Sequence, residues 1–267
     1  MSDNPLIALD AMGGDNAPTE IVAGAVRAAK ELGVRVALVG RSEEIAACMA
    51  RHGPTPDTIT VVPASEVIEM DEKPAQAARQ KKDSSIVVGL RMVKQGEADA
   101  FLSAGNTGAI MAAAIMYLGR IKGIERHKLV AHMPLSGKLS VFLDIGANAD
   151  CKPNYLLQFA EMASAYMERV WKVDRPSVAL LNIGEEEAKG STLAQEAYEL
   201  LAGSDLNFIG NVEGRDVPTG SADVIVTDGF TGNVVIKTME GMADFIMGQL
   251  KVAIKSRPWY AAAGLAL

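Results

Sequence analysis

The stretch SAGNTGAIM, residues 103–111, follows the apolar run DAFLS and leads into the apolar run AIMAAAIMYLG. In it, Gly105 and Gly108 flank Asn106 and Thr107. Glycine loses much conformational entropy in regular structure, so paired glycines indicate a special backbone path. Two explanations are open at this point: a tight turn from strand to helix, or a loop whose backbone N–H groups bind an anion at a helix N-terminus.

Short apolar runs alternate with amphipathic stretches on both sides of this segment. The apolar runs predict strands at residues 6–12, 34–40, 58–63, 99–103, 129–134, 139–146, 177–184, 206–211 and 222–229. The amphipathic stretches predict helices at residues 18–32, 42–52, 84–96, 107–119, 153–171, 191–203 and 233–255, with Ser42 as a cap. Residues 64–85 are more polar and fit neither pattern, and residues 129–146 form either a hairpin or adjacent strands.

This alternation implies crossover connections between neighbouring strands. We therefore expect a single α/β domain over residues 1–267, with a doubly wound, mostly parallel sheet. The chain has 267 residues and about half of them are hydrophobic, which is enough for a sizeable core.

Charge and cysteine content limit the class of protein. The net charge is −7, which argues against a nucleic-acid partner because such partners need a basic face. The two cysteines, Cys48 and Cys151, fit a reducing cytoplasm rather than a disulfide framework. We see no signal peptide, and no apolar run reaches the roughly 18 residues of a membrane span, so we expect a soluble cytoplasmic protein.

Six clusters of Gly, Asn and Asp follow predicted strands, at residues 10–18, 103–109, 144–153, 182–191, 210–216 and 227–233. Ligands of open parallel sheets bind outside the carboxyl ends of the strands. One such loop is better explained by local turn chemistry, but six at the same topological position favour a site for a polar, anionic ligand. The chain has neither GxGxxG nor GxxxxGK[ST], which disfavours a nicotinamide dehydrogenase and a P-loop enzyme.

Seven segments together resemble one family: ALDAMGGDNAP, KKDSSIVVGL, SAGNTGA, DIGANADCKP, NIGEEEAKGS, FIGNVEGRD and VTDGFTGNVVIKTMEG, from residue 8 to 241. The chain is similar to the bacterial acyl-ACP:phosphate acyltransferases of phospholipid synthesis. The resemblance implies transfer of a fatty acyl group from acyl carrier protein to inorganic phosphate, giving acyl phosphate. It also implies a Rossmann-like α/β/α sandwich, similar to the folds of phosphotransacetylases and isocitrate dehydrogenases.

The same resemblance implies a homodimer in peripheral contact with the membrane. It implies a glycerol-3-phosphate acyltransferase as the downstream partner. We expect no cofactor, and no metal site because His52, His127 and His132 show no metal-ligand spacing. Members of this family continue past a point equivalent to Leu267. Either further residues follow Leu267 or this member is shortened, and we carry over no site residue from that region.

Lys189 and Asn233 are the catalytic candidates. Phosphate is itself the nucleophile, so the reaction needs a positioned cation and oxyanion donors rather than an activated Ser or Cys. By spacing alone, Lys189 is better explained as an i, i+4 partner of Glu185, and Asn233 as the N-cap of the last helix. The resemblance assigns Lys189 as the catalytic cation and Asn233 as the oxyanion donor.

A further set is predicted to bind phosphate or substrate. Its members come from the Gly/Asn/Asp loops: Gly13, Gly14, Asp15, Asn16, Gly105, Asn106, Thr107, Gly108, Asp144, Asn148, Asp228 and Gly232. For Asp228, orienting Lys189 or Asn233 and capping a turn are equally good explanations.

Other conspicuous residues favour structural roles. Cys151 is better explained as a small packed thiol than as a nucleophile. Arg79, Lys81 and Lys82 form a solvated charge run, with contact to an acidic carrier as the alternative. The methionine-rich side of the helix at residues 234–255 is expected to pack in the core. Contact with lipid, assisted by Lys251, Lys255 and Arg257, is the alternative.

Two rival functions stay open. A phosphotransacetylase-like enzyme would use acyl-CoA with a short acyl group. A non-catalytic scaffold for lipid enzymes would tolerate changes at Lys189 and Asn233.

Overall fold

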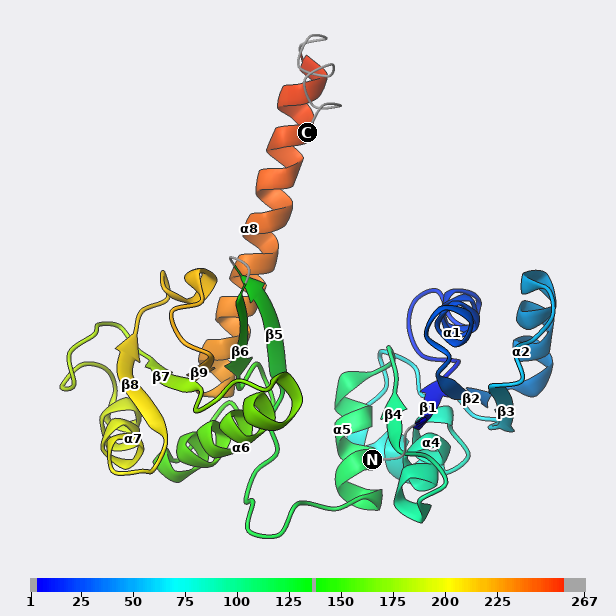
Figure 1. The fold of residues 1–267 in the computed structure, drawn as a ribbon, viewed down its shortest axis with the longest axis horizontal. Coiled ribbons are helices and arrows are strands. Elements are labelled where there is room, and N and C mark those ends of the chain that lie inside the picture. The colour runs from blue at the N-terminus through cyan, green and yellow to red at the C-terminus, as the bar shows by residue number, and fades with distance from the viewer. Residues whose placement is uncertain (1–3, 136–137, 257–267) are drawn as a thin grey trace. The chain divides into compact units, whose positions relative to one another are not determined.

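The computed structural model describes residues 4–135 and 138–256 (Figure 1). The chain divides into two compact units, Met1–Ile121 and Lys122–Leu267, which we describe separately. Whether the two units act as the single domain expected from the sequence stays a prediction.

The first unit is a four-stranded parallel sheet in the order β3-β2-β1-β4. Its strands are β1 (Leu6–Asp10), β2 (Arg35–Gly40), β3 (Ile59–Pro63) and β4 (Ala100–Leu102). Its helices are α1 (Thr19–Leu32), α2 (Ser42–Met49), a 3-10 turn at Ala50–His52, α3 (Pro74–Gln80), α4 (Ser85–Gln95) and α5 (Thr107–Tyr117).

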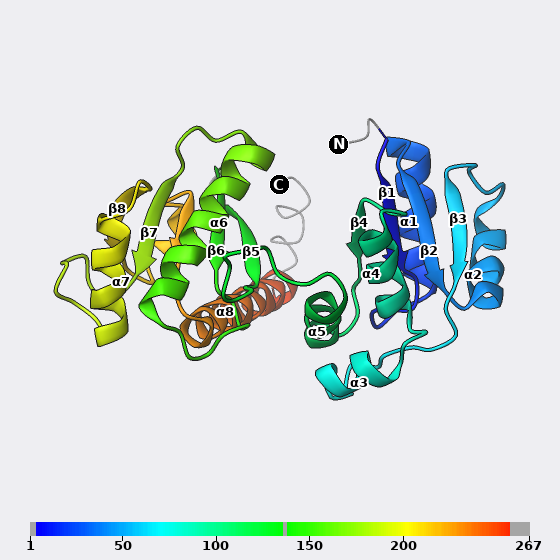
Figure 2. The same cartoon turned by 90° about the horizontal axis from the view of Figure 1, so that it is seen from below.

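Alternation along β2 explains the layers of this unit. Val36 and Leu38 pack with α1 and α2 on one face, whereas Ala37 and Val39 pack with α4 on the other. Successive side chains of a strand point to opposite faces, so one apolar strand can supply both cores. Figure 2 shows α1 and α4 on the two sides of the sheet.

The second unit is a five-stranded sheet in the order β5-β6-β9-β7-β8. Its elements are β5 (Val130–Leu135), β6 (Lys138–Leu143), α6 (Pro153–Trp171), β7 (Ser177–Leu181), α7 (Thr192–Ala202), β8 (Asn207–Val212), a 3-10 turn at Val217–Thr219, β9 (Val224–Val226) and α8 (Gly229–Ser256). Only the β5–β6 pair is antiparallel among the described strands, so the hairpin explanation is confirmed. Val141 and Leu143 pack with α6 on one face, and Phe142 packs with α8 on the other.

Three expectations for individual elements are corrected. Helix α3 lies in the segment that fitted no pattern, and it begins with Pro74 in its first turn, a favoured place for proline. Helix α2 begins at Ser42 itself, so Arg41 and not Ser42 stands at the cap position. Helix α8 begins at Gly229 rather than Asn233, which places Asn233 inside the helix.

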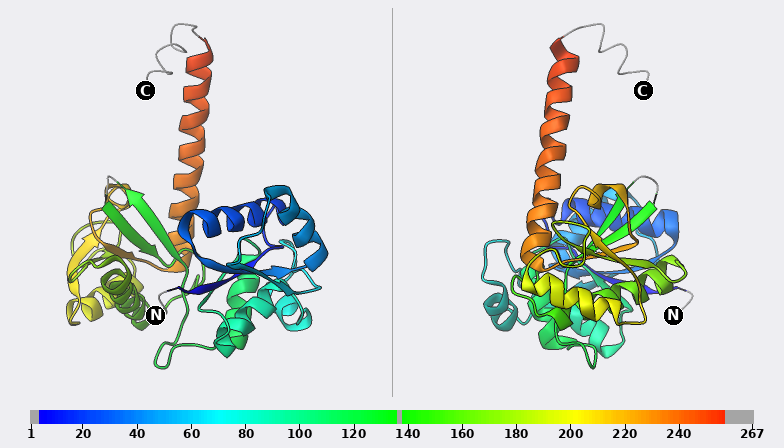
Figure 3. Two further views of the ribbon diagram at one scale, coloured as in Figure 1. Left: turned by 45° about the vertical axis from the view of Figure 1, so that its right-hand side comes forward. Right: turned by 90° about the vertical axis from the view of Figure 1, so that its left-hand side faces the viewer.

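The expectation that α8 packs in the core holds only for its first half. Val235, Ile236 and Met239 pack against the sheet, but Phe245 is 60% exposed and Leu250 is 50% exposed. Figure 3 shows the helix continuing beyond the sheet of its own unit. The Lys255 side chain and Arg257 lie outside what the structure describes. Across the described ranges, no helix is long and apolar enough to cross a membrane.

Candidate active site

The carboxyl ends of four parallel strands carry the predicted residues of the second unit. Strands β6, β9, β7 and β8 run in one direction, so the loops that follow them lie along one edge of the sheet. This edge holds the loop at residues 144–152, the loop at residues 182–191 and the start of α8. Lys189, Asn233, Asp144, Asn148 and Asp228 all lie on these segments.

Asp144 is the buried acceptor at the centre of this edge. Its side chain is fully buried. One carboxylate oxygen accepts from the N–H groups of Leu129, Gly146 and Ala147 at 3.0–3.3 Å. The other accepts from the backbone N–H and the side-chain amide of Asn148, both at 2.8 Å. Five donors occupy this carboxylate, so Asp144 fixes the loop that follows β6.

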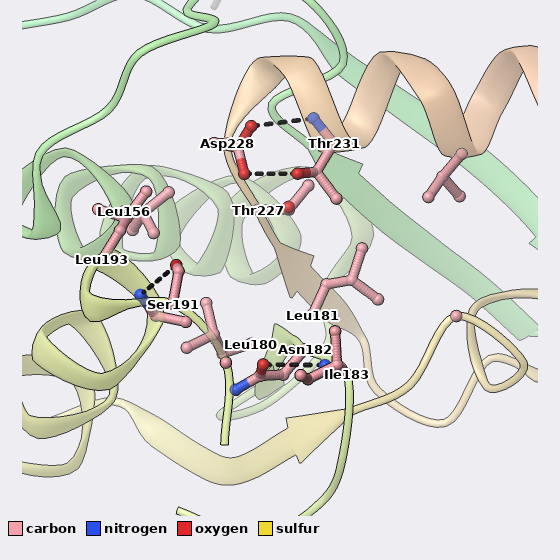
Figure 4. A pocket seen from close by; sticks show the side chains of 14 residues that line it. Leu156, Leu180, Leu181, Asn182, Ile183, Ser191, Leu193, Thr227, Asp228 and Thr231 are labelled. Atoms are coloured by element: carbon pink, nitrogen blue, oxygen red, sulfur yellow. Dashed lines mark hydrogen bonds between the residues drawn. The ribbon is translucent and has the colours of Figure 1, made fainter. Parts of the chain in front are cut away.

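Asp228 caps the helix that carries Asn233. Its two carboxylate oxygens accept from the N–H of Thr231 at 2.9 Å and from the Thr231 hydroxyl at 2.7 Å (Figure 4). A side-chain acceptor at this position satisfies an N–H that has no partner within the helix. These contacts correspond to the capping of a turn, which was one of the two explanations for Asp228.

The first turn of α8 lies against the loop fixed by Asp144. The Gly229 N–H donates to the Asn148 carbonyl at 2.8 Å, and a Cβ on Gly229 would meet the Asn148 backbone at 2.6 Å. A Cβ on Gly232 would collide with the Asp144 carbonyl oxygen. Both glycines are thus needed for close approach. One turn later, the Asn233 side-chain amide donates to the Ile145 carbonyl at 3.2 Å.

Lys189 lies in a loop that side chains from several elements hold in place. The Asn182 amide donates to the Lys189 carbonyl at 3.0 Å. Gln195 of α7 donates to the Ala188 carbonyl at 2.8 Å, and Asn211 of β8 donates to the Glu186 carbonyl at 2.9 Å. Lys189 itself is exposed. Among the described residues, the ion pair of Glu185 is with Arg215, at 3.9 Å, and not with Lys189 as spacing alone predicted.

A cavity of about 330 Å³ opens beside this loop (Figure 4). Its walls come from α6, the end of β7, the first turn of α7 and the start of α8. Gly190 and Ser191, the residues after Lys189, contribute to the wall.

The first unit brings its two predicted loops together. The Ser103 hydroxyl donates to the buried Asp10 carboxylate at 2.6 Å and accepts from the Gly105 N–H at 3.0 Å. A Cβ on Gly13 would meet the Gly105 nitrogen at 2.8 Å, so the loop with Gly13, Gly14, Asp15 and Asn16 lies against the loop after β4. Asp15 and Asn16 are exposed.

Asn106 is held by protein contacts on every side. Its side-chain oxygen accepts from the Ala109 N–H at 3.0 Å and caps α5. Its amide lies within 3.2–3.3 Å of the carbonyls of Glu69, Met70 and Glu72. Gly108 lies against Pro74, and Thr107 is exposed at the first turn of α5. The local-turn explanation of SAGNTGA therefore accounts for the Asn106 side chain and leaves the Thr107 and Gly108 N–H groups for a ligand.

The charged residues at positions 78–85 differ in their contacts. Lys81 pairs with Glu72 at 2.6 Å and donates to the Val67 carbonyl at 2.6 Å. Arg79 and Lys82 are exposed.

Sequence reasoning missed Asp10, Ser103 and Lys128. Asp10 and Ser103 lie inside quoted motifs, but their partnership spans 93 positions and no local spacing reveals it. Lys128 lies in a loop with no motif, where its ammonium group donates to the Phe159 carbonyl at 3.4 Å.

Cys151 is unsuited to be a nucleophile. Burial raises the pKa of its thiol to about 11, and the thiolate is the reactive form. We expect Cys151→Ser to retain the acyl transfer that the resemblance implies within about twofold, since phosphate is the nucleophile of that reaction and no thiol is required. Residue-level alkylation by iodoacetamide should be slow at pH 7.5 and should accelerate toward pH 11. Loss of activity in Cys151→Ser with an unchanged melting temperature would contradict this assignment.

Lys128 makes stability depend on pH. Burial lowers its pKa to about 7 from the usual 10.5, although the Asp144 charge opposes the shift. Between these values the unfolded chain binds this proton and the folded chain does not, so this group makes the free energy of unfolding rise with pH. Lys128→Met lacks the titration and should be more stable than the wild type near pH 6, with the difference shrinking toward pH 10. Urea unfolding at each pH measures this, and a pH-independent difference would refute it.

Comparisons with known proteins show the family to which the chain belongs. A family model described as fatty acid synthesis protein matches residues 6–266. The phosphate acyltransferase of Dictyoglomus turgidum is 52% identical over 263 residues, which cover 98% of this chain and 78% of that protein. The phosphate acyltransferase of Syntrophomonas wolfei is 56% identical over 243 residues, covering 90% and 76%.

A solved phosphotransacetylase from Streptococcus pyogenes shares the fold. It superposes with a TM-score of 0.67 and 20% identity, covering 91% of this chain and 83% of that one. The expected α/β class with mostly parallel strands is confirmed. With a family model matching nearly its whole length and relatives above 50% identity, this chain belongs to the fatty acid synthesis protein family, which includes the phosphate acyltransferases.

Proposed function

We propose that this chain transfers a long-chain fatty acyl group from acyl carrier protein to inorganic phosphate, giving acyl phosphate for phospholipid synthesis. The observation that carries the proposal is the exposed Lys189, held in a fixed loop beside a largely apolar cavity in a chain more than 50% identical to named phosphate acyltransferases.

In the proposed step, a phosphate oxygen attacks the thioester carbonyl. A C–O bond forms, the tetrahedral oxyanion collapses, the C–S bond breaks, and the carrier thiol leaves as a thiolate. We assign Lys189 as the cation that offsets repulsion between phosphate and the developing oxyanion. Asn233 uses one amide hydrogen on the Ile145 carbonyl and has a second for the oxyanion.

The other predicted residues divide into two proposed roles. In the first unit, the N–H groups of Gly13, Gly14, Asp15, Asn16, Thr107 and Gly108 are proposed to bind phosphate, with α5 favouring the anion by its N-terminus. The proposed contribution of Gly105 and Asn106 is to hold that loop. In the second unit, the contacts of Asp144, Asn148, Asp228 and Gly232 support a positioning role around Asn233.

The proposed setting is a homodimer in the cytoplasm, in peripheral contact with the membrane and supplying a glycerol-3-phosphate acyltransferase. The exposed apolar side chains of α8 support a partner or lipid contact there. Equilibrium sedimentation and flotation with anionic vesicles test these two parts separately.

The test of the reaction mixes the chain with palmitoyl-ACP and phosphate and traps acyl phosphate with hydroxylamine. We expect hydroxamate that depends on phosphate. Product from acetyl-CoA but not from palmitoyl-ACP would favour the phosphotransacetylase-like rival. No product from either donor, with a folded protein, would favour the scaffold.

A further inference from the structure

The cavity beside the Lys189 loop is lined by hydrocarbon at its walls. Leu156 comes from α6, Leu180 from β7, Leu193 and Ala194 from α7, and Val235 from α8. Leu156 and Leu180 are almost fully buried, so the cavity reaches the core of the second unit. These five side chains carry no hydrogen-bonding atom.

Three polar side chains of the lining, those of Asn182, Ser191 and Asp228, form hydrogen bonds within the protein. The Asn182 oxygen accepts from the Ile183 N–H at 2.8 Å, and its amide donates to the Lys189 carbonyl. The Ser191 hydroxyl accepts from the Ala194 N–H at 3.3 Å, and both Asp228 oxygens accept from Thr231. The dashed lines in Figure 4 mark these bonds, except the one to the Lys189 carbonyl. A ligand rich in amides or hydroxyls would find few free partners here and would lose its hydration.

Charge and size restrict the ligand further. Asp228 places a carboxylate in the wall, which disfavours a phosphate group inside the cavity. The volume of about 330 Å³ lies at the small end of the range for ligand pockets, about 300–1,000 Å³. Both points favour part of an uncharged hydrocarbon chain over a nucleotide or a phosphorylated arm.

We propose that this cavity binds the hydrocarbon chain of the acyl substrate and sets which chain lengths are accepted. The inference rests on the proposed function for the identity of the ligand. Lys189 lies next to Gly190 and Ser191 of the wall, so a chain held in the cavity would present its carbonyl end toward the loop that carries the catalytic cation.

Ala194→Leu is the variant that tests the inference. The added carbons would fill part of the cavity, and leucine is a good helix former, so α7 should tolerate it. We expect kcat/KM for palmitoyl-ACP to fall about tenfold relative to that for octanoyl-ACP, the order of effect for a methylene-scale change in an apolar pocket. The matched control is Ala202→Leu, at the exposed end of the same helix, which should keep the wild-type ratio.

Equal loss for both chain lengths, or the same shift in Ala202→Leu, would overturn the inference. So would an unchanged ratio in Ala194→Leu. Each of these outcomes would require acyl phosphate formation by the wild type, so they differ from a failure of the proposed function, in which the wild type makes no product.

A second measurement does not depend on turnover or on any variant. Dodecanoic acid with a diazirine at the end of its chain is bound to the unmodified chain and photolysed, and the adducts are mapped by peptide mass spectrometry. We expect adducts on peptides containing Leu156, Leu193 or Val235, reduced by excess unlabelled dodecanoate. Adducts confined to other peptides, or no competable labelling, would overturn the inference even if acyl phosphate is formed.

Discussion

Replacing Lys189 by alanine is expected to lower kcat for acyl phosphate formation about 10²- to 10³-fold, the usual effect of removing one group that stabilises an oxyanion. The loop around Lys189 is held by Asn182, Gln195 and Asn211 through backbone carbonyls, none of which the substitution removes. The variant should therefore fold with nearly the wild-type melting temperature. Hydroxylamine trapping measures the rate, and thermal unfolding measures the fold.

Two controls make this result specific. Lys94→Ala removes an exposed lysine of α4 in the first unit and should retain the wild-type rate. Lys189→Arg retains the charge in a different shape and should recover part of the rate. Full activity in Lys189→Ala would exclude this lysine as the catalytic cation. The remaining explanations would be a different catalytic cation or the non-catalytic scaffold.

Replacing Gly232 by alanine is expected to destabilise the second unit by more than about 3 kcal/mol. Overpacking usually costs about 1–3 kcal/mol, and here the nearest neighbour is the Asp144 backbone, which cannot rotate away. The added Cβ would collide with the Asp144 carbonyl oxygen, and the first turn of α8 would have to move from the loop after β6. Urea unfolding of the two proteins measures the difference.

The matched control is Gly241→Ala in the same helix. No atom lies within 4 Å of a Cβ added there, so alanine should be neutral or stabilising by up to about 1 kcal/mol through its higher helix propensity. Equal stability of the Gly232 and Gly241 variants would refute the close approach between α8 and the Asp144 loop.

The layers of the fold could be predicted because they depend on local patterns. Runs such as VALVG at residues 36–40 and VALL at residues 178–181 are apolar throughout, as is typical of strands covered on both faces. Ser84 and Ser191 cap α4 and α7 as local rules expect. The proposal of Lys189 as the catalytic cation rests on the resemblance of its segment to a known motif, since spacing alone favoured a pair with Glu185.

The start of α8 could not be predicted from the same local signals. Asn233 precedes a clean helical period and is a good N-cap, so it looked like the first residue. Gly229 and Gly232 are poor helix formers, so local propensity does not predict a helix over these residues. In the structure they form the first turn of α8, and Asp228 caps this turn by accepting a hydrogen bond from the Thr231 N–H. Glycine is needed at these positions because the helix packs closely against backbone of the loop that contains Asp144. This contact is between distant parts of the sequence, so no local pattern predicts it.

The role of Asp144 as an internal hydrogen-bond acceptor could not be predicted from the sequence, for a different reason. Its donors include the N–H of Leu129, 15 positions earlier. A motif can identify this carboxylate as special but cannot distinguish a ligand contact from an internal acceptor. The exposed apolar half of α8 could not be predicted either. Helical periodicity predicts that the helix has an apolar side, but it does not predict which part of the protein covers that side.

The shared carboxylate of Asp144 also couples segments that are separate in the chain. Because the amide protons of Leu129, Gly146, Ala147 and Asn148 have one side chain as their common acceptor, a fluctuation that frees one of them weakens the hold on the others. In hydrogen–deuterium exchange these four amides would behave as one cooperative opening unit, with a single opening free energy. The hydrogen bonds that hold this edge of the sheet, next to Asn233, would then form together or break together.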